Sequence, residues 1–172
     1  MTNLVFYIAS AVAIISTLMV ITRMEPVHSL LYLIVSLLAV SLMFFILGAP
    51  FIAALEVIVY AGAIMVLFVF VIMMLNLGRE AAEQERRWID ISMWKGPVIL
   101  ALVLLALMIH VLHGGNPGAA SGRVVSPKEM SIALFGPYLM VVELASILLL
   151  AGLVGAYHLA RRDTDNREQK RS

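Results

Sequence analysis

The sequence predicts an all-α integral membrane protein with five transmembrane helices. Hydrophobic residues make up 62% of the 172 residues and charged residues only 13%, whereas soluble domains average about 45–50% apolar and about 25% charged residues. Five apolar stretches come close to the roughly 20 residues that a helix needs to cross a bilayer core of about 30 Å. We place these spans approximately at Leu4–Ile21, His28–Leu47, Phe51–Leu77, Pro97–Leu112 and Phe135–Ala160.

The distribution of Lys and Arg predicts the orientation of the helices. Five spans put the two termini on opposite sides of the membrane, and cytoplasmic loops carry an excess of Lys and Arg. We therefore expect the N-terminus and the Gly-rich loop of residues 113–134 outside, where only Arg123 and Lys128 would lie. The loop of residues 78–95 and the C-terminus are expected in the cytoplasm. The ten cations on that side are Arg23, Arg79, Arg86, Arg87, Lys95, Arg161, Arg162, Arg167, Lys170 and Arg171.

The composition also limits the classes of function. We expect one membrane domain over residues 1–162 and a charged cytoplasmic tail over residues 163–172. The chain has no Cys, which excludes Cys-held iron–sulfur clusters and thiolate-bound zinc. A net charge of +1, with no basic run before the tail, gives no footprint for nucleic acid. Four histidines lie near predicted helix ends, where imidazole reaches water, and their spacing favours no metal site. They are His28, His110, His113 and His158.

Two acidic residues lie well inside the predicted spans, Glu56 in the third and Glu143 in the fifth. An ionised side chain at the centre of a bilayer costs roughly 2.5–3.5 kcal/mol on insertion scales, so such residues usually face protein and often mark proton routes. Counted from Phe51 and Phe135, the two acids lie roughly 7.5 and 12 Å into their helices, and we expect them in one polar layer of the outer half. The structural alternative is that each accepts hydrogen bonds from a neighbouring helix.

The third span has further unusual residues. Tyr60 lies four residues after Glu56, hence on the same helical face, where its hydroxyl reaches a carboxyl group or an intervening water. Gly62 then interrupts a run of bulky residues, which favours either close helix packing or a single-turn π-bulge, a feature that tends to occur at functional sites. Phe51–Leu77 would be about 40 Å long as a regular helix, longer than the bilayer core, and either tilt or a bulge explains the excess.

The second span is expected to pack along the third. Gly48, Ala49 and Pro50 leave room only for a tight reversal between them, which makes the two spans antiparallel neighbours. Ser29, Tyr32 and Ser36 form a polar stripe on the second span. Hydrogen bonding between helices explains this stripe more simply than the lining of a water wire, and both interpretations stay open.

Three blocks of the sequence carry a family resemblance. They are EVIVYAGAIMVLFVFVIMMLNL at residues 56–77, PVHSLLYLIVSLL at residues 26–38 and LFGPYLMVVELASILLLAGLV at residues 134–154. These blocks resemble the subunit J family of bacterial NADH:quinone oxidoreductase (respiratory complex I), the counterpart of the mitochondrially encoded sixth subunit. The first block is the most specific of the three. The loops and the tail carry little recognisable pattern, so no function is transferred to them.

The resemblance implies a non-redox subunit that couples quinone reduction to proton translocation in the bacterial cytoplasmic (inner) membrane. It implies a position beside the quinone-site subunits, at the junction with the antiporter-like subunits of the membrane arm. NADH, FMN, iron–sulfur clusters and quinone would all belong to other subunits, and this chain would have no catalytic residue and no cofactor of its own.

The resemblance also implies that the third helix holds a π-bulge near residues 60–68 and straightens during turnover. Straightening would rotate Val66 and Phe68 and so open or close a water connection, which is gating by a two-state element. Glu56 and Tyr60 match the polar positions of the family on this helix, and Gly62 matches the residue that gives the helix room to move.

Two other functions compete with this interpretation. A structural adaptor would fill the junction of a larger membrane assembly without gating, and it should tolerate a larger side chain at Gly62. A subunit of a multi-subunit cation/proton antiporter would have a similar composition, but it would purify without flavin and iron–sulfur absorption.

Overall fold

The five-helix membrane architecture is confirmed. The computed structural model describes the placement of residues 2–23, 26–75, 91–114 and 123–169. Contacts divide the chain into two units, Met1–Ser126 and Pro127–Ser172, and each is described by itself. Within the described residues, five helices are long and apolar enough to cross a membrane, and they are Asn3–Thr22, Pro26–Ile46, Pro50–Met74, Trp94–Gly114 and Leu139–Arg161.

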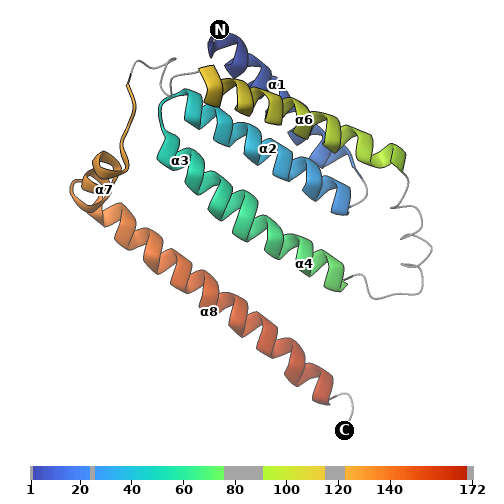
Figure 1. Ribbon diagram of the computed structural model, residues 1–172. Coiled ribbons are helices and arrows are strands. Elements are labelled where there is room, and N and C mark those ends of the chain that lie inside the picture. The colour runs from blue at the N-terminus through green and yellow to red at the C-terminus, as the bar shows by residue number, and fades with distance from the viewer. Residues whose placement is uncertain (1, 24–25, 76–90, 115–122, 170–172) are drawn as a thin grey trace. The chain divides into compact units, whose positions relative to one another are not determined.

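The first unit is organised around its second helix. Helix α2 contacts α1, α6 and all three segments of the third membrane-spanning helix, so it lies at the centre of this unit (Figure 1). The elements of the unit are α1 (Thr2–Thr22), α2 (Pro26–Ile46), α3 (Pro50–Leu55), the π-helical segment η1 (Glu56–Ile64), α4 (Met65–Leu75) and α6 (Ile91–Gly114).

The core of this unit lies between α1, α2 and α6. Ala9 of α1 and Ala39 of α2 are fully buried, and such small residues allow two membrane helices to approach closely. Two hydrogen bonds of Ser36 also join α1 to α2: its hydroxyl lies 2.8 Å from that of Thr17 and donates to the Ala13 carbonyl at 3.3 Å. The core residues are Val5, Ala9, Val12, Ala13, Val35, Ala39, Leu42, Ile46, Leu104 and Val111.

The reversal between α2 and α3 is the tight turn that the sequence predicts. Gly48 has a φ of 87°, a left-handed conformation that glycine adopts without steric cost. The Gly48 N–H donates to the Phe45 carbonyl at 3.1 Å and the Ala49 N–H donates to the Phe44 carbonyl at 2.9 Å, which is the Schellman pattern of helix ends. Pro50 then begins α3, so the second and third spans are neighbours as expected.

Helix α6 extends beyond the predicted fourth span. The prediction started the span at Pro97, but α6 begins at Ile91 and contains Pro97 in its interior. Membrane helices tolerate an internal proline because neighbouring groups can satisfy the backbone carbonyl that it leaves free.

Residues 76–90, 115–122 and 170–172 lie outside the described residues. Most of the predicted cytoplasmic loop and part of the predicted outer loop therefore also lie outside the described residues. Orientation and the boundary of the tail stay predictions.

The second unit contains α7 (Pro127–Phe135) and α8 (Leu139–Gln169). The predicted fifth span began at Phe135, whereas the long helix begins at Leu139 because a turn separates α7 from α8. A Cβ at Gly136 would lie only 2.7 Å from the Ile132 carbonyl oxygen, so glycine permits the close approach that this turn needs. Glu143 consequently lies four residues into its helix, about 6 Å, rather than about 12 Å.

Candidate functional site

The third membrane-spanning helix contains a π-helical segment, as the sequence resemblance predicts. At the start of η1, the Glu56 N–H donates to the carbonyl of Ile52, four residues back, as in an α-helix. At its end, the Met65 N–H donates to the carbonyl of Tyr60, five residues back. Leu55 and Met65, which flank the segment, have ordinary α-helical dihedral angles. The helix therefore accommodates one extra residue without breaking, which is how a π-bulge is built.

The segment lies earlier along the helix than predicted. We expected the bulge near residues 60–68, and η1 covers residues 56–64. Tyr60 and Gly62 lie inside it, whereas Val66 and Phe68 lie beyond it in α4. Glu56 is its first residue, so the candidate proton carrier lies where the hydrogen-bond pattern changes.

Gly62 is tightly packed against the backbone of η1. A Cβ at this position would lie 3.1 Å from the Val57 carbonyl oxygen, closer than carbon and oxygen normally approach. Val57 is five residues before Gly62, so the contact arises within the widened turn itself. By contrast, a Cβ at Gly152 or Gly155 of α8 would meet nothing within 4 Å. Of these three membrane-helix glycines, Gly62 alone has a local steric reason to lack a side chain.

Glu56 and Tyr60 have no side-chain partners within the described part of the chain. Glu56 is half-buried and Tyr60 is exposed at the surface of the first unit. The two side chains form no direct hydrogen bond to each other, which was one of the two expected arrangements. Both polar groups are therefore available to water or to groups of another subunit.

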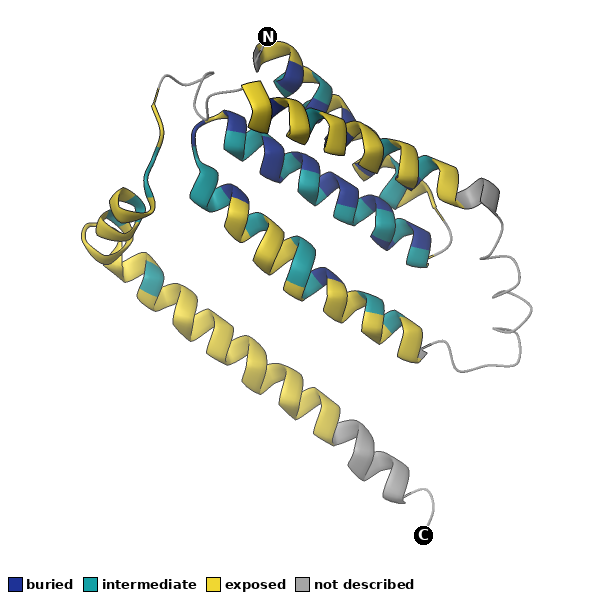
Figure 2. Ribbon diagram, viewed as in Figure 1, coloured by how far each residue is buried: buried dark blue, intermediate teal, exposed yellow. Residues whose placement is uncertain are grey.

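The remaining predicted site residues lie on two different units. Val66 and Phe68 are 64% and 49% exposed on the outer face of α4, where Figure 2 shows a largely exposed helix. Glu143 is exposed on α8 in the second unit, and its carbonyl accepts a hydrogen bond from the Ser146 hydroxyl at 2.8 Å. The polar layer expected to contain both Glu56 and Glu143 stays a prediction.

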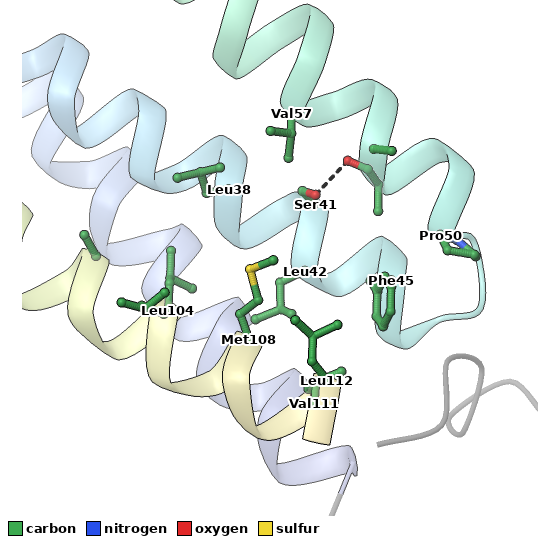
Figure 3. A pocket seen from close by; sticks show the side chains of 14 residues that line it. Leu38, Ser41, Leu42, Phe45, Pro50, Val57, Leu104, Met108, Val111 and Leu112 are labelled. Atoms are coloured by element: carbon green, nitrogen blue, oxygen red, sulfur yellow. Dashed lines mark hydrogen bonds between the residues drawn. The ribbon is translucent and has the colours of Figure 1, made fainter. Parts of the chain in front are cut away.

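An apolar cavity of about 510 Å³ lies beside the start of η1, between the third helix, α2 and α6 (Figure 3). Val57 lines it from η1, and Leu105 and Met108 line it from α6. The hydroxyl of Ser41 also lines the cavity, but it donates to the Ala53 carbonyl at 2.8 Å. Ser41 thereby fixes α3 to α2 just before the π-helical segment, while the cavity leaves the first turn of η1 incompletely packed.

Sequence reasoning missed the role of Ser41 and misjudged His28. Ser41 carries no signal beyond being a serine in an apolar helix, and its partner is a backbone carbonyl. We expected His28 to reach water, yet it is 4% exposed, and its ring lies edge-on to Trp94 with 6.4 Å between centroids. The reason is that α6 covers the start of α2, a contact that the sequence does not reveal. The other three histidines are exposed.

Comparisons with known proteins agree with the sequence resemblance. The model of the family NADH-ubiquinone/plastoquinone oxidoreductase chain 6 matches residues 16–159. NADH-quinone oxidoreductase subunit J of Pseudomonas aeruginosa is 62% identical over 159 residues, which cover 92% of this chain and 96% of that protein. The subunit J of Escherichia coli K12 is 56% identical over 158 residues, covering 92% of this chain and 86% of that protein.

A more distant relative shows the same extent of similarity. NADH-quinone oxidoreductase subunit J of Buchnera aphidicola from Schizaphis graminum is 50% identical over 157 residues, which cover 91% of this chain and 96% of that protein. The similarity thus extends through all five membrane-spanning helices and far beyond the three blocks that first suggested it. The chain belongs to the NADH-ubiquinone/plastoquinone oxidoreductase chain 6 family, which includes the bacterial subunit J proteins.

Proposed function

We propose that this chain is a non-redox membrane subunit of NADH-quinone oxidoreductase that couples quinone reduction to proton translocation through its third helix. Membership of the family supports its place in this complex. The observation that supports the coupling role is η1, which combines a protonatable Glu56 and a sterically constrained Gly62 in one membrane-spanning helix.

The proposed mechanism is a change between π and α hydrogen bonding in η1. One residue of an α-helix corresponds to a rotation of about 100°, so removing the extra residue would turn α4 by about that angle relative to α3. This rotation would move Val66 and Phe68 across the exposed face of the first unit. Their bulk would open or close a water connection from Glu56 and Tyr60 to the adjacent subunits. The third helix would thus act as a two-state element whose two states differ in hydrogen-bond register.

The proposal assigns electron transfer to other subunits. NADH, FMN, iron–sulfur clusters and quinone would bind there, and the lack of Cys in this chain supports the absence of an iron–sulfur cluster from it. The quinone-site and antiporter-like subunits of the membrane arm would contact the exposed face of η1 and α4. The assembly would lie in the bacterial cytoplasmic membrane, with the N-terminus of this chain outside and its C-terminus in the cytoplasm.

Substitution of Gly62 by Leu tests the gating role against the adaptor alternative. Ala63→Leu is the matched control, because Ala63 lies in the same segment and already has a Cβ. Both variants should assemble, and only Gly62→Leu should lose coupled quinone reduction and proton pumping. Normal pumping by an assembled Gly62→Leu complex would favour the structural adaptor and contradict gating.

Purification of the assembly with this chain as the affinity handle tests its place in the complex. We expect the absorption of flavin and iron–sulfur clusters in the purified material. An intact assembly without either chromophore would instead favour the cation/proton antiporter.

A further inference from the structure

The apolar cavity of about 510 Å³ is open on one side. It lies where α6 and the third membrane-spanning helix both pack against α2 (Figure 3). Leu42 of α2 and Leu104 of α6 are buried and close the cavity toward the core of the first unit. Leu105 and Leu112 of α6 also line it, but both are exposed. The cavity is therefore accessible from the surroundings of the chain.

The lining residues show that the cavity runs along the helices. Ala101 and Leu112 line it from α6, and they lie about 16 Å apart along the helix axis. From the third helix Pro50 and Val57 line it, about 10 Å apart along the axis. Pro50 follows the α2–α3 turn and Val57 belongs to the first turn of η1. The cavity thus extends from the end of the unit at that turn to the start of η1.

The side chains that line the cavity favour a hydrocarbon ligand. Among the lining side chains that the structure describes, only Ser41 carries a hydroxyl, and this hydroxyl already donates to the Ala53 carbonyl at 2.8 Å. An apolar cavity offers water no partners and stays dry, whereas folded proteins leave few voids larger than a water molecule. An apolar molecule is therefore the expected occupant.

The volume of the cavity matches one long hydrocarbon chain. A cavity of about 150 Å³ lined by Leu, Ile and Phe holds one benzene molecule. On that scale, about 510 Å³ accommodates about three such molecules, or roughly 20 carbon atoms. This is close to one acyl chain of a membrane lipid. Because the helices of the first unit are membrane-spanning, such chains surround the unit and reach the cavity through its open side.

A cation lies at the end of the cavity beside the α2–α3 turn. The Val125 N–H donates to the Gly48 carbonyl at 2.8 Å, which holds the segment after residue 122 against this turn. Arg123 is exposed and lies within about 7 Å of Val125 along the backbone. A guanidinium has five N–H donors, so it can bind a phosphate beside another partner. The charge of Arg123 therefore favours a phospholipid over an uncharged hydrocarbon such as the tail of a quinone.

We propose that the cavity between α2, α6 and the third helix binds one acyl chain of an anionic phospholipid whose phosphate lies beside Arg123. The acyl chain would contact Val57 and fill the space beside the first turn of η1, which the chain itself leaves incompletely packed. The inference concerns the occupant of the cavity, so it does not depend on the change of hydrogen-bond register proposed for η1.

A structure of the assembled complex in nanodiscs of brominated phosphatidylglycerol tests the occupant directly. Bromine scatters more strongly than carbon, so we expect bromine density on an ordered acyl chain between Leu42 and Met108, with phosphate density beside Arg123. A quinone tail or a protein side chain in the cavity, or no ordered density there, would overturn the proposal. This measurement uses the unaltered chain, so it does not depend on whether a variant assembles.

Ala101→Leu tests the location of the acyl chain, with Ala106→Leu as the matched control. Both alanines are exposed residues of α6, but only Ala101 lines the cavity. The added isobutyl group at Ala101 would occupy the space of the acyl chain. Native mass spectrometry of the complex should therefore show one retained phospholipid fewer for Ala101→Leu and no change for Ala106→Leu. Equal retention by both variants would refute the location.

Arg123→Gln tests the recognition of the headgroup, with Arg23→Gln as the control. The Arg23 guanidinium lies 5.8 Å from the centre of the Tyr32 ring, near the start of α2 and so at its opposite end from the α2–α3 turn. In nanodiscs of mixed phosphatidylglycerol and phosphatidylethanolamine, Arg123→Gln should lower the retained ratio of the first lipid to the second by up to about fivefold, as for an exposed ion pair. Arg23→Gln should leave the ratio unchanged. An unchanged ratio in Arg123→Gln would contradict the proposed headgroup contact.

Discussion

Replacing Gly62 by Ala should shift the third helix from the π toward the α form. The added Cβ would lie 3.1 Å from the Val57 carbonyl oxygen, so η1 would have to move by a few tenths of an ångström. A regular α-helix accepts Ala at interior positions better than any other residue, which means that the contact penalises the π geometry alone. An extra methyl group in a packed site costs about 1–3 kcal/mol, which changes the ratio of the two forms by roughly 5- to 150-fold.

Structures of the assembled Gly62→Ala complex before and after quinone reduction would show the register directly. In the α form the Met65 N–H would donate to the carbonyl of Ala61 instead of Tyr60, and proton pumping per quinone reduced should fall. Gly152→Ala in α8 is the matched control, because its Cβ would meet nothing within 4 Å. A Gly62→Ala complex that keeps the bond to Tyr60 in both states and pumps normally would refute the reasoning.

Three further substitutions have defined outcomes. Glu56→Gln keeps the shape of the side chain but cannot ionise, so proton-coupled turnover should fall by roughly tenfold or more at normal assembly, and unchanged turnover would make Glu56 structural. Gly96→Ala would bring a Cβ into collision with the Tyr32 hydroxyl, which should destabilise the complex by about 1–3 kcal/mol in thermal unfolding. Adding Tyr32→Phe should restore part of that loss, and no restoration would contradict the assigned collision. Ser41→Ala removes the hydrogen bond to the Ala53 carbonyl and should cost about 0.6 kcal/mol, so a change in thermal stability several times larger would show that more than this bond is lost.

The membrane fold was largely predictable because the composition of each stretch indicates whether it lies in lipid or in water. All five spans were found, since an uninterrupted apolar run has no stable alternative in a bilayer. The errors lie where local backbone geometry overrides hydropathy. Helix α8 begins four residues after Phe135 because of the turn at Gly136, and α6 continues through Pro97.

The resemblance predicted a π-bulge in the third helix but placed it too far along, near residues 60–68 rather than 56–64. Tyr60 and Gly62 lie in η1 as expected, Glu56 lies in it although it was expected before it, and the role of these residues in a functional site stays a prediction. Composition could not distinguish a π-bulge from a tilted regular helix, because the two differ in which carbonyl accepts the hydrogen bond of each N–H. The burial of His28 depends on Trp94 from a helix far along the chain, and no local pattern encodes such a contact.

The chain buries its helices to different extents, and this difference indicates which contacts act on the third helix. Buried residues make up 44% of the apolar stretch of Pro26–Ile46 but only 6% of that of Pro50–Met74. Contacts with its own subunit thus restrain η1 and α4 weakly. In the proposed mechanism, adjoining subunits and lipid would therefore supply most of the forces that choose between the two hydrogen-bond registers. Substitutions in a neighbouring subunit should then reproduce the effects of substitutions here, and the isolated chain in a bilayer would reveal only the intrinsic preference of the helix.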